Sequence, residues 1–449
     1  MFVYRNKDLP KDPYYPSDLK KLGYFVTEND QIRKIGDPEA GFQYKINRND
    51  RFNVKSREAM NDCIRELIIT RLHDAGLEDM RLPLREKADG QIVQSRPDEA
   101  HVPIMVSGNL RTASRIIVVF GEPVQDFGVW AYRIIGQDKI NKGSAVDFAR
   151  AVLGEDDNKT GNALILANTG QLLWNCLYSR AVTNITWASL PRPAGNWGPP
   201  AMSWRTKIPG NNDWREHIHH VFNKVLRPCI RENTRIDIIG VSEGGLGAIE
   251  YLEANWETWR PFISGICLGD PLQSTSADID MSTLADPKSF TAFLSARCRG
   301  YVMSDEELGT RHSGYRSHGC NCYSSGESCY TECILPSAWR DMLHWLDMLY
   351  EDPTYEEQIM IIGRDLDENI KQDLDKLNVA SEEDEAPRAT HEDSQEDGGE
   401  GEKEDEKEGE KDAQQNTGGA AKAHAKRFSS LEKITEQCED EDEVSEEKP

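Results

Sequence analysis

The sequence predicts an α/β fold: a doubly wound, mostly parallel sheet with helices on both faces, followed by a disordered acidic tail. Continuous apolar runs such as 115–120 and 163–167 predict buried strands, and segments of helical periodicity separate them. Strands that are apolar on both faces and alternate with helices are typical of parallel sheets. The tail is predicted from composition, because residues 381–449 contain 25 acidic and 9 basic residues.

Composition divides the chain into three regions. Residues 1–41 are rich in Pro, Asp, Lys and Tyr, which predicts an irregular N-terminal arm that packs on the body through its aromatic side chains. Residues 42–365 are long enough to form one large α/β domain. Residues 366–449 form the acidic, low-complexity tail. Such a tail typically makes a protein soluble, and a histone-facing role is the alternative.

Within the body, the apolar pattern places each element in turn. Strands are predicted where Val, Ile, Leu and aromatic residues run together, at 42–46, 102–106, 115–120, 163–167, 236–239, 262–268, 299–303 and 320–323. Helices are predicted where apolar side chains recur every three or four residues, at 57–75, 130–135, 145–153, 213–226 and 339–350. Gly76 directly follows the first of these helices and is a typical helix end.

The most informative motif is Gly240-Val-Ser-Glu-Gly, which matches the pattern G-x-S-x-G. It lies between the strand 236–239 and an apolar helical pattern, and this context is typical of a nucleophile elbow. Ser242 would occupy a strained turn, and a Cβ at Gly240 or Gly244 would collide with the neighbouring strand or helix. An elbow in the middle of such a series, with further strands after it, predicts an α/β-hydrolase-like sheet.

To act as a nucleophile, Ser242 needs a general base, an acid that orients this base, and an oxyanion hole. Asp305 follows a late strand, where the acid is expected, and Asp270 is the alternative. His312 is the candidate base, and it would have to fold back across the site. The other histidines between the elbow and the tail lie before the last strand or within the last helix, at His318 and His344.

The predicted oxyanion region is acidic. The backbone N–H of Glu243 is one expected donor, but the side chain of Glu243 adds negative charge. The loop that begins at Gly121 adds a second acid, Glu122, and a proline. We therefore interpret the chain as a hydrolase scaffold without a working triad. The alternative is an active serine hydrolase that uses Ser242 with the acid and base candidates above.

Residues 171–212 form a long insertion that is rich in Trp and Pro. Trp187, Trp197 and Trp204 are the candidates for a lid or a partner surface, since long loops are often functional. The alternative is an ordered cap that packs its own aromatic side chains.

No metal or cofactor site is predicted. The candidate zinc ligands are Cys320, Cys322, Cys329 and Cys333. A typical zinc site combines two closely spaced cysteines with a second such pair farther along the chain, and these four do not follow that pattern. We therefore interpret them as cysteines of the core and of the sheet edge. A second group, read as a surface cluster on a helix, consists of His217, His219 and His220. The sequence contains no G-x-x-x-x-G-K-[ST] motif and so no P-loop.

The charge and hydropathy of the sequence argue against further classes of protein. The body has no run of Lys and Arg with interleaved aromatic residues, so direct high-affinity binding of RNA or DNA is not predicted. No membrane span and no signal peptide are predicted, and no membrane partner is expected. The 10 cysteines are expected to be reduced thiols in the nucleus or the cytoplasm.

Seven short motifs occur together and in order: Leu9-Pro-Lys-Asp-Pro, Lys21-Leu-Gly-Tyr-Phe, Ile46-Asn-Arg-Asn, Val118-Val-Phe-Gly-Glu, Gly240-Val-Ser-Glu-Gly-Gly, Ser304-Asp-Glu-Glu-Leu-Gly and Gly319-Cys-Asn-Cys. They resemble the fungal argonaute-binding-protein-two domain family over roughly residues 1–350. The resemblance implies an α/β-hydrolase-like fold. It also implies relatives that include a subunit of the argonaute small-RNA chaperone complex and a domain at the C-terminus of fungal class II histone deacetylases.

The resemblance further implies a role in heterochromatin assembly, in the nucleus and also in the cytoplasm. The implied partners are argonaute, chromatin-silencing or histone deacetylase complex subunits, with small RNA bound only indirectly. A metazoan relative has a histidine after its last strand. The resemblance places Tyr330 at that position here, which favours a non-catalytic protein.

Overall fold

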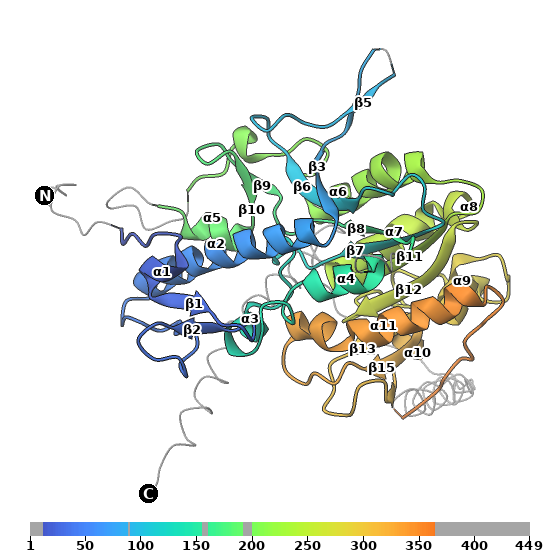
Figure 1. Cartoon of the computed structure of the whole chain (residues 1–449). Coiled ribbons are helices and arrows are strands. Elements are labelled where there is room, and N and C mark those ends of the chain that lie inside the picture. Colours follow the sequence, from blue (N-terminus) through green and yellow to red (C-terminus); the bar gives the residue numbers. More distant parts are fainter. Residues whose placement is uncertain (1–11, 89, 155–159, 192–199, 364–449) are drawn as a thin grey trace, which may run out of the picture. The chain divides into compact units, whose positions relative to one another are not determined.

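The computed structural model describes residues 12–88, 90–154, 160–191 and 200–363. Its centre is a nine-stranded sheet with the order β14-β15-β13-β12-β11-β7-β8-β6-β3 (Figure 1). In chain order these strands are β3 (Leu77–Leu82), β6 (Val102–Ser107), β7 (Arg115–Phe120), β8 (Ala163–Leu166), β11 (Arg235–Val241), β12 (Ile263–Gly269), β13 (Cys298–Val302), β14 (Arg311–His312) and β15 (Asn321–Ser324).

The strands from β8 through β7, β11, β12 and β13 to β15 are parallel to one another. The strands β6 and β3 at one edge, and β14 at the other, are antiparallel to their neighbours. The carboxyl ends of β7, β11 and β12 therefore lie side by side at one edge of the sheet. This arrangement is an α/β-hydrolase-like fold, and it confirms the predicted fold class.

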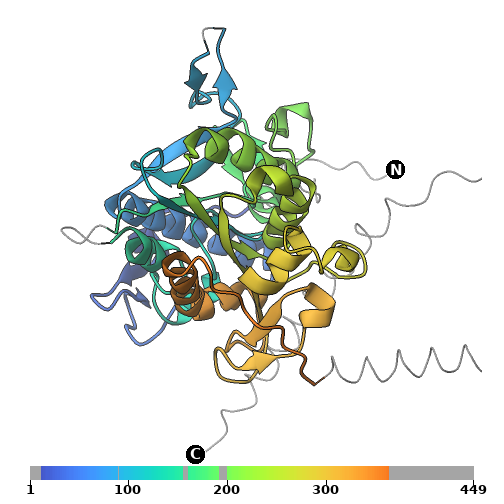
Figure 2. The same cartoon turned by 90° about the vertical axis from the view of Figure 1, so that its right-hand side faces the viewer.

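Helices bury both faces of the sheet, and Figure 2 shows the sheet between the two groups. One core packs alternate strand residues such as Ile117 and Val119 against α2 (Asp50–Asp74), α4 (Val146–Leu153) and α11 (Ile334–Glu351). The other core packs the intervening residues against the helices of the second face: α6 (Trp214–His220) with its π-helical continuation Val221–Leu226, α7 (Glu243–Ala254), α8 (Trp256–Trp259) and α9 (Phe290–Arg297). Burial on both faces explains why the strands are continuous apolar runs.

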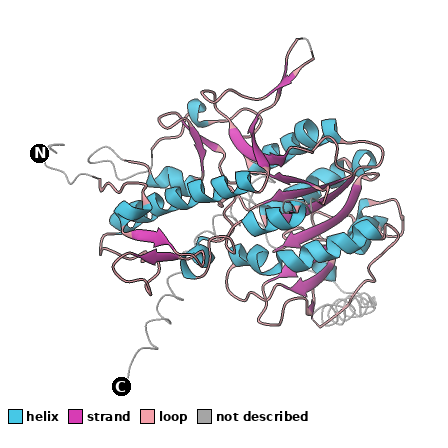
Figure 3. Ribbon diagram, viewed as in Figure 1, coloured by secondary structure: helices cyan, strands magenta, loops and turns pink. Residues whose placement is uncertain are grey.

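Short elements complete the described chain. The remaining α-helices are α1 (Leu19–Leu22), α3 (Tyr132–Gln137), α5 (Asn184–Ser189) and α10 (Tyr315–His318). The 3-10 turns are η3 (Trp204–Thr206), η5 (Arg227–Cys229), η6 (Met281–Thr283) and η7 (Thr331–Cys333). Three small hairpins lie outside the central sheet (Figure 3): β1 (Tyr24–Val26) with β2 (Ile32–Lys34), β4 (Arg85–Glu86) with β5 (Ile92–Val93), and β9 (Leu173–Asn175) with β10 (Arg180–Val182).

The N-terminal region differs from the irregular arm that we expected. Residues 12–41 contain the helical turn α1 and the β1–β2 hairpin. Tyr24 and Ile32 are buried in the same core as α2, and Phe42 packs edge-on against Tyr24 with ring centroids 5.5 Å apart. Gly23 makes the tight connection from α1 to β1 possible, because its φ of 90° is accessible mainly to glycine. The strand expected at 42–46 does not form.

The described part of the insertion 171–212 contacts α2 through hydrogen bonds and an ion pair. The ammonium group of Lys55 donates to the Ser189 carbonyl at 3.2 Å, and the hydroxyl of Thr186 donates to Glu58 at 3.0 Å. The guanidinium of Arg180 pairs with Asp62 at 2.8 Å. The described part of the insertion therefore forms an ordered cap, which was the alternative interpretation of its sequence.

The predicted tail, residues 366–449, lies outside the described residues. Among the helices of the described chain, none is long and apolar enough to cross a membrane.

Candidate functional site

Ser242 stands on a strained turn between β11 and α7. Its backbone has φ 47° and ψ −121°, in a region that non-glycine residues rarely occupy. A Cβ at Gly240 would lie 2.9 Å from the backbone nitrogen of Gly245, and a Cβ at Gly244 would lie 2.7 Å from the carbonyl oxygen of Phe120. The two glycines are thus required by close backbone approach, as the motif predicted.

Two carboxyl groups flank the Ser242 hydroxyl. Its Oγ atom lies 3.0 Å from Oε1 of Glu122 and 3.0 Å from Oδ2 of Asp270. Glu122 follows β7 and Asp270 follows β12, and these are the two strands that neighbour β11. Ser242 and Glu122 are only 5% and 7% exposed, whereas Asp270 is half-buried.

A proton count fixes the chemistry of this group. A serine hydroxyl carries one hydrogen, so it cannot donate to both carboxylates at once. If neither carboxyl group is protonated, the carboxylate that does not accept the serine hydrogen lies opposite a lone pair of the serine oxygen. Burial raises the pKa of Glu122 to about 7, and the charges of Glu243, Glu332 and Asp270 add to this, whereas the Ser242 hydrogen bond opposes it. Ser242 can therefore donate to Glu122 or to Asp270 but not to both at once, and the raised pKa of Glu122 makes this carboxyl group readily protonated near neutral pH.

The structure corrects the expected grouping of Ser242 with Asp305 and His312. Asp305 is exposed in the loop after β13. His312 lies on β14, and its Nδ1 atom contacts the Ser313 carbonyl at 2.9 Å. β14 is four strand positions from β11, which corresponds to about 19 Å. Within the described residues, no imidazole forms a hydrogen bond with Ser242; its acid partner is Asp270, the alternative candidate.

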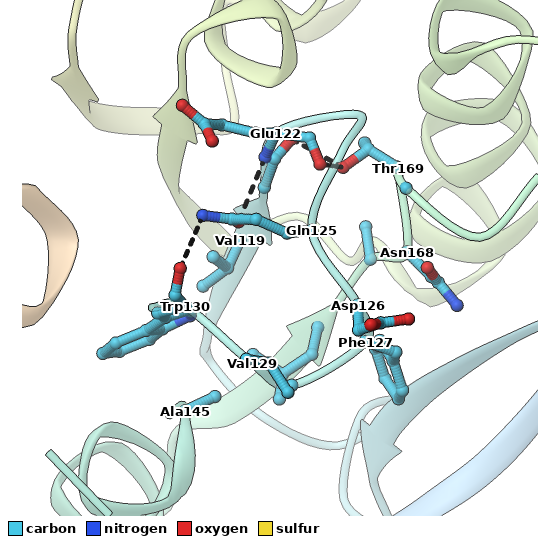
Figure 4. A pocket seen from close by; sticks show the side chains of 15 residues that line it. Val119, Glu122, Gln125, Asp126, Phe127, Val129, Trp130, Ala145, Asn168 and Thr169 are labelled. Carbon is cyan, nitrogen blue, oxygen red and sulfur yellow. Dashed lines mark hydrogen bonds between the residues drawn. The ribbon is translucent and has the colours of Figure 1, made fainter. Parts of the chain in front are cut away.

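The expected oxyanion hole is altered on the side of Gly121. In a hydrolase the loop after this strand supplies one backbone N–H to the oxyanion. Here the N–H of Glu122 donates to Oε1 of Gln125 at 3.3 Å. The Gln125 amide in turn donates to the Trp130 carbonyl at 2.9 Å, which fixes the glutamine (Figure 4). The cavity behind this loop holds only about 30 Å³, roughly the room of one water molecule.

Tyr330 occupies the region where the resemblance expects a histidine. The Arg133 guanidinium covers the Tyr330 ring, 3.9 Å from its centroid. The same arginine lies 3.9 Å from the carboxylate of Glu332, whose pKa is raised by burial. A tyrosine ring stacked beneath a cation supplies no general base for Ser242.

The cysteines that were considered as zinc candidates differ in burial. Cys320, Cys322 and Cys333 are buried, whereas Cys329 is exposed. In the described chain, no group of three or more His, Cys, Asp or Glu side chains is arranged to hold a metal ion.

The histidines of α6 do not form the expected surface cluster. His217 is fully buried, contacts Asn211 at 2.8 Å and accepts the Asn168 N–H at 3.1 Å. His220 accepts the Leu84 N–H at 3.1 Å. Burial lowers the pKa of His217 to about 3 and that of His220 to about 4, so both are neutral structural acceptors.

The three tryptophan candidates for a partner surface have different environments. Trp187 is only 7% exposed and donates from its indole nitrogen to the Pro200 carbonyl at 2.8 Å, so it belongs to the cap's own core. Trp204 is 77% exposed. Trp197 lies outside the described residues.

Fold and site together define an α/β-hydrolase-like module that retains a nucleophile elbow and sets its serine between two carboxyl groups. The chain belongs to the Arb2 domain family, whose sequence model matches residues 15–308. This membership confirms the family resemblance read from the sequence motifs.

Comparison with solved structures finds further similar chains. A histone deacetylase from Saccharomyces cerevisiae is 12% identical, with 64% of this chain and 97% of that chain covered and a TM-score of 0.36. An esterase from Pyrobaculum calidifontis is 11% identical, with coverages of 69% and 94% and a TM-score of 0.28. The esterase LipW from Mycobacterium marinum is 14% identical, with coverages of 58% and 72% and a TM-score of 0.26. No curated protein matches the chain in sequence.

Proposed function

We propose that the chain is a non-catalytic interaction module that acts with argonaute, chromatin-silencing or histone deacetylase complex subunits in heterochromatin assembly. The environment of Ser242 carries the non-catalytic part of this proposal. Its hydroxyl is held between two carboxyl groups, and it has no imidazole partner among the described residues. A serine without a base is a weak nucleophile. Membership of the Arb2 domain family supports the choice of partners.

An active serine hydrolase is the second candidate, because Ser242 retains the strained elbow conformation. In such an enzyme Glu122 or Asp270 would have to accept the serine proton. The two functions differ in one direct measurement.

We expect no Ser242-dependent labelling when the purified protein is treated with a fluorophosphonate probe at pH 7. The serine is 5% exposed and hydrogen-bonds to carboxyl groups rather than to an imidazole among the described residues, so attack on the probe's phosphorus is slow. Ser242→Ala serves as the matched control, and a known serine esterase shows that the probe is active. Labelling that disappears in Ser242→Ala would establish the hydrolase instead.

We expect the tagged protein to co-purify with argonaute or silencing-complex subunits from nuclear extract, and Ser242→Ala to recover the same subunits in equal amount. The substitution removes a buried hydroxyl and leaves the surface unchanged, so only a catalytic role would make it matter. RNase treatment should leave these protein contacts intact, since small RNA is proposed to be bound only through a protein partner. Deletion of residues 381–449 separates this proposal from a histone-facing role of the tail, which would require the deleted segment.

A further inference from the structure

Large apolar side chains are exposed in the described part of the insertion 171–212, and we call them its apolar face. They are Leu177 and Tyr178 in the β9–β10 turn, Ile185 in α5, and Met202 and Trp204 at η3. The three elements pack together, because β9 contacts both α5 and η3, and the Cys176 thiol contacts the Arg205 carbonyl at 3.4 Å. Leu177 and Trp204, the chain neighbours of these two residues, are 80% and 77% exposed. Exposed apolar side chains that are grouped in this way mark a surface that another segment or molecule covers.

Local hydrogen bonds fix two parts of the apolar face. The side-chain oxygen of the buried Asn175 accepts the N–H of Leu177 at 2.9 Å, which shapes the β9–β10 turn. At η3, Ser203 and Thr206 form a reciprocal capping box beside Trp204. The apolar side chains therefore stand on an ordered backbone, and this lowers the entropic cost of covering them.

The first described residues lie beside the insertion. The Asp12 carboxylate accepts two hydrogen bonds from the Arg51 guanidinium, at 2.7 Å and 2.6 Å. The same guanidinium donates to the carbonyl of Leu190, at the end of α5, at 2.8 Å. Paired hydrogen bonds between a guanidinium and a carboxylate fix the geometry of both groups. Residues 1–11 therefore join the described chain next to the insertion.

The apolar face is within reach of residues 1–11. Leu190 packs with Trp187 in one apolar cluster, and the Trp187 indole donates to the Pro200 carbonyl at 2.8 Å. The chain from Pro200 to Trp204 spans at most about 14 Å. An extended segment of the length of residues 1–11 spans about 36 Å. It is therefore long enough to extend from Asp12 along these contacts to the apolar face.

The composition of this segment suits an apolar surface. It opens with Met1-Phe-Val-Tyr. Residues 381–449, at the other end of the chain, contain 25 acidic and 9 basic residues and a single aromatic residue, Phe428. Burial of Phe and Tyr rings favours association, whereas burial of unpaired charges opposes it. Of the two ends of the chain, the N-terminal segment is the one that matches the face.

We propose that residues 1–11 dock on the apolar face of the insertion, with the rings of Phe2 and Tyr4 packed on the β9–β10 turn and on Trp204. Because the segment is tethered at Asp12, its effective concentration at the face is about millimolar, so a contact too weak to hold a separate peptide is sufficient. The contact covers Trp204, which the sequence indicated as a candidate for a partner surface. A partner that uses this surface has to displace the segment.

The first test is photo-crosslinking of the full chain with p-benzoylphenylalanine in place of Phe2. We expect mass spectrometry to locate the crosslink in residues 176–185 or 200–206. A mixture of isotopically light and heavy protein should give crosslinks only within one chain. The matched control carries the same group in place of Ile35, an exposed residue after β2, and should give no crosslink to the insertion.

Hydroxyl-radical labelling of the full chain measures the coverage independently. We expect Phe2→Ser combined with Tyr4→Ser to raise the labelling rates of Leu177 and Trp204 by about three-fold or more, because the apolar contact is lost. Leu308, which is exposed in the loop after β13, is the internal reference and should be labelled at the same rate in both proteins.

Crosslinks to other parts of the body, or no crosslink at all, would overturn the proposal. Crosslinks between light and heavy chains would overturn it too, and would assign the apolar face to a second copy of the chain. So would equal labelling of Trp204 with and without the two aromatic side chains. Partner capture from extract is read separately, so the failure of this contact leaves the proposed interaction role to its own experiment.

Discussion

Glu122→Gln is expected to make the folded protein more stable by about 3 kcal/mol at pH 8 and to change its stability little at pH 4. In the unfolded chain Glu122 ionises near 4.5, whereas burial raises its folded pKa to about 7. Between these values the folded state holds a proton that the unfolded state has lost, so stability falls as the pH rises from about 4.5 to 7 and the loss is complete above that range. The rise of the Glu122 pKa from 4.5 to about 7 corresponds to about 3 kcal/mol.

Glutamine keeps the shape and the hydrogen bond to Ser242 but has no charge to bury. The measurement is urea unfolding of both proteins at several values between pH 4 and pH 8. Glu66→Gln, at an exposed position on α2, is the control and should differ from the parent by less than about 0.5 kcal/mol throughout. A difference for Glu122→Gln that does not grow with pH would mean that burial does not raise the pKa of Glu122 in the folded protein.

The expected gain in stability of Glu122→Gln bears on whether Ser242 is catalytic. An acid that costs stability at neutral pH lies where a hydrolase would bind its oxyanion, and its backbone N–H is turned toward Gln125. Both features oppose the stabilisation of negative charge on a substrate. Both features are consistent with an elbow that serves the fold rather than catalysis, since it lies where the carboxyl ends of β7, β11 and β12 are adjacent.

The central sheet was predictable because its strands satisfy local and tertiary preferences together. Runs such as residues 116–120 are apolar on both faces, and both faces are buried. The edge strand β3 was missed because Leu77–Leu82 reads LEDMRL, and an edge strand buries little of its polar side. The first turns of α2 were missed too. The helix begins at Asp50, where the side chain of Asn49 accepts the Arg51 N–H, well before its apolar pattern becomes regular.

The site was predictable only in part. The elbow was predictable from a short motif, because the geometry of the turn alone requires its two glycines and its serine. The partners of Ser242 depend on which strands become neighbours of β11, and spacing along the chain does not encode that order. Asp270 was named as the alternative acid and Glu122 only as an acid of the oxyanion loop, and their contact with Ser242 follows from both standing directly after the strands that flank β11. The ion pair between Asp237 of β11 and Arg115 of β7, at 2.6 Å, was not predicted. A single acid between isoleucines does not indicate that it is buried or which residue it pairs with.

The second large effect is expected at the elbow itself, where Gly244→Ala should destabilise the protein by about 3 kcal/mol. In an isolated helix alanine is favoured over glycine by about 1 kcal/mol, so local propensity alone predicts the opposite sign. The new Cβ would lie 2.7 Å from the Phe120 carbonyl oxygen and still closer to that of Gly121. Backbone oxygens at the end of β7 cannot turn aside as a side chain can, so α7 or β7 must shift.

Gly136→Ala in α3 is the matched control, because an added Cβ there meets no atom within 4 Å. It should be neutral or stabilise the protein by up to about 1 kcal/mol. Urea unfolding at pH 7 compares both variants with the parent protein. If Gly244→Ala proved as stable as Gly136→Ala, α7 would not pack against the end of β7 as closely as the structure shows. The position of Ser242 between Glu122 and Asp270 would then lose its structural basis, because the same contact brings the elbow to the Glu122 loop.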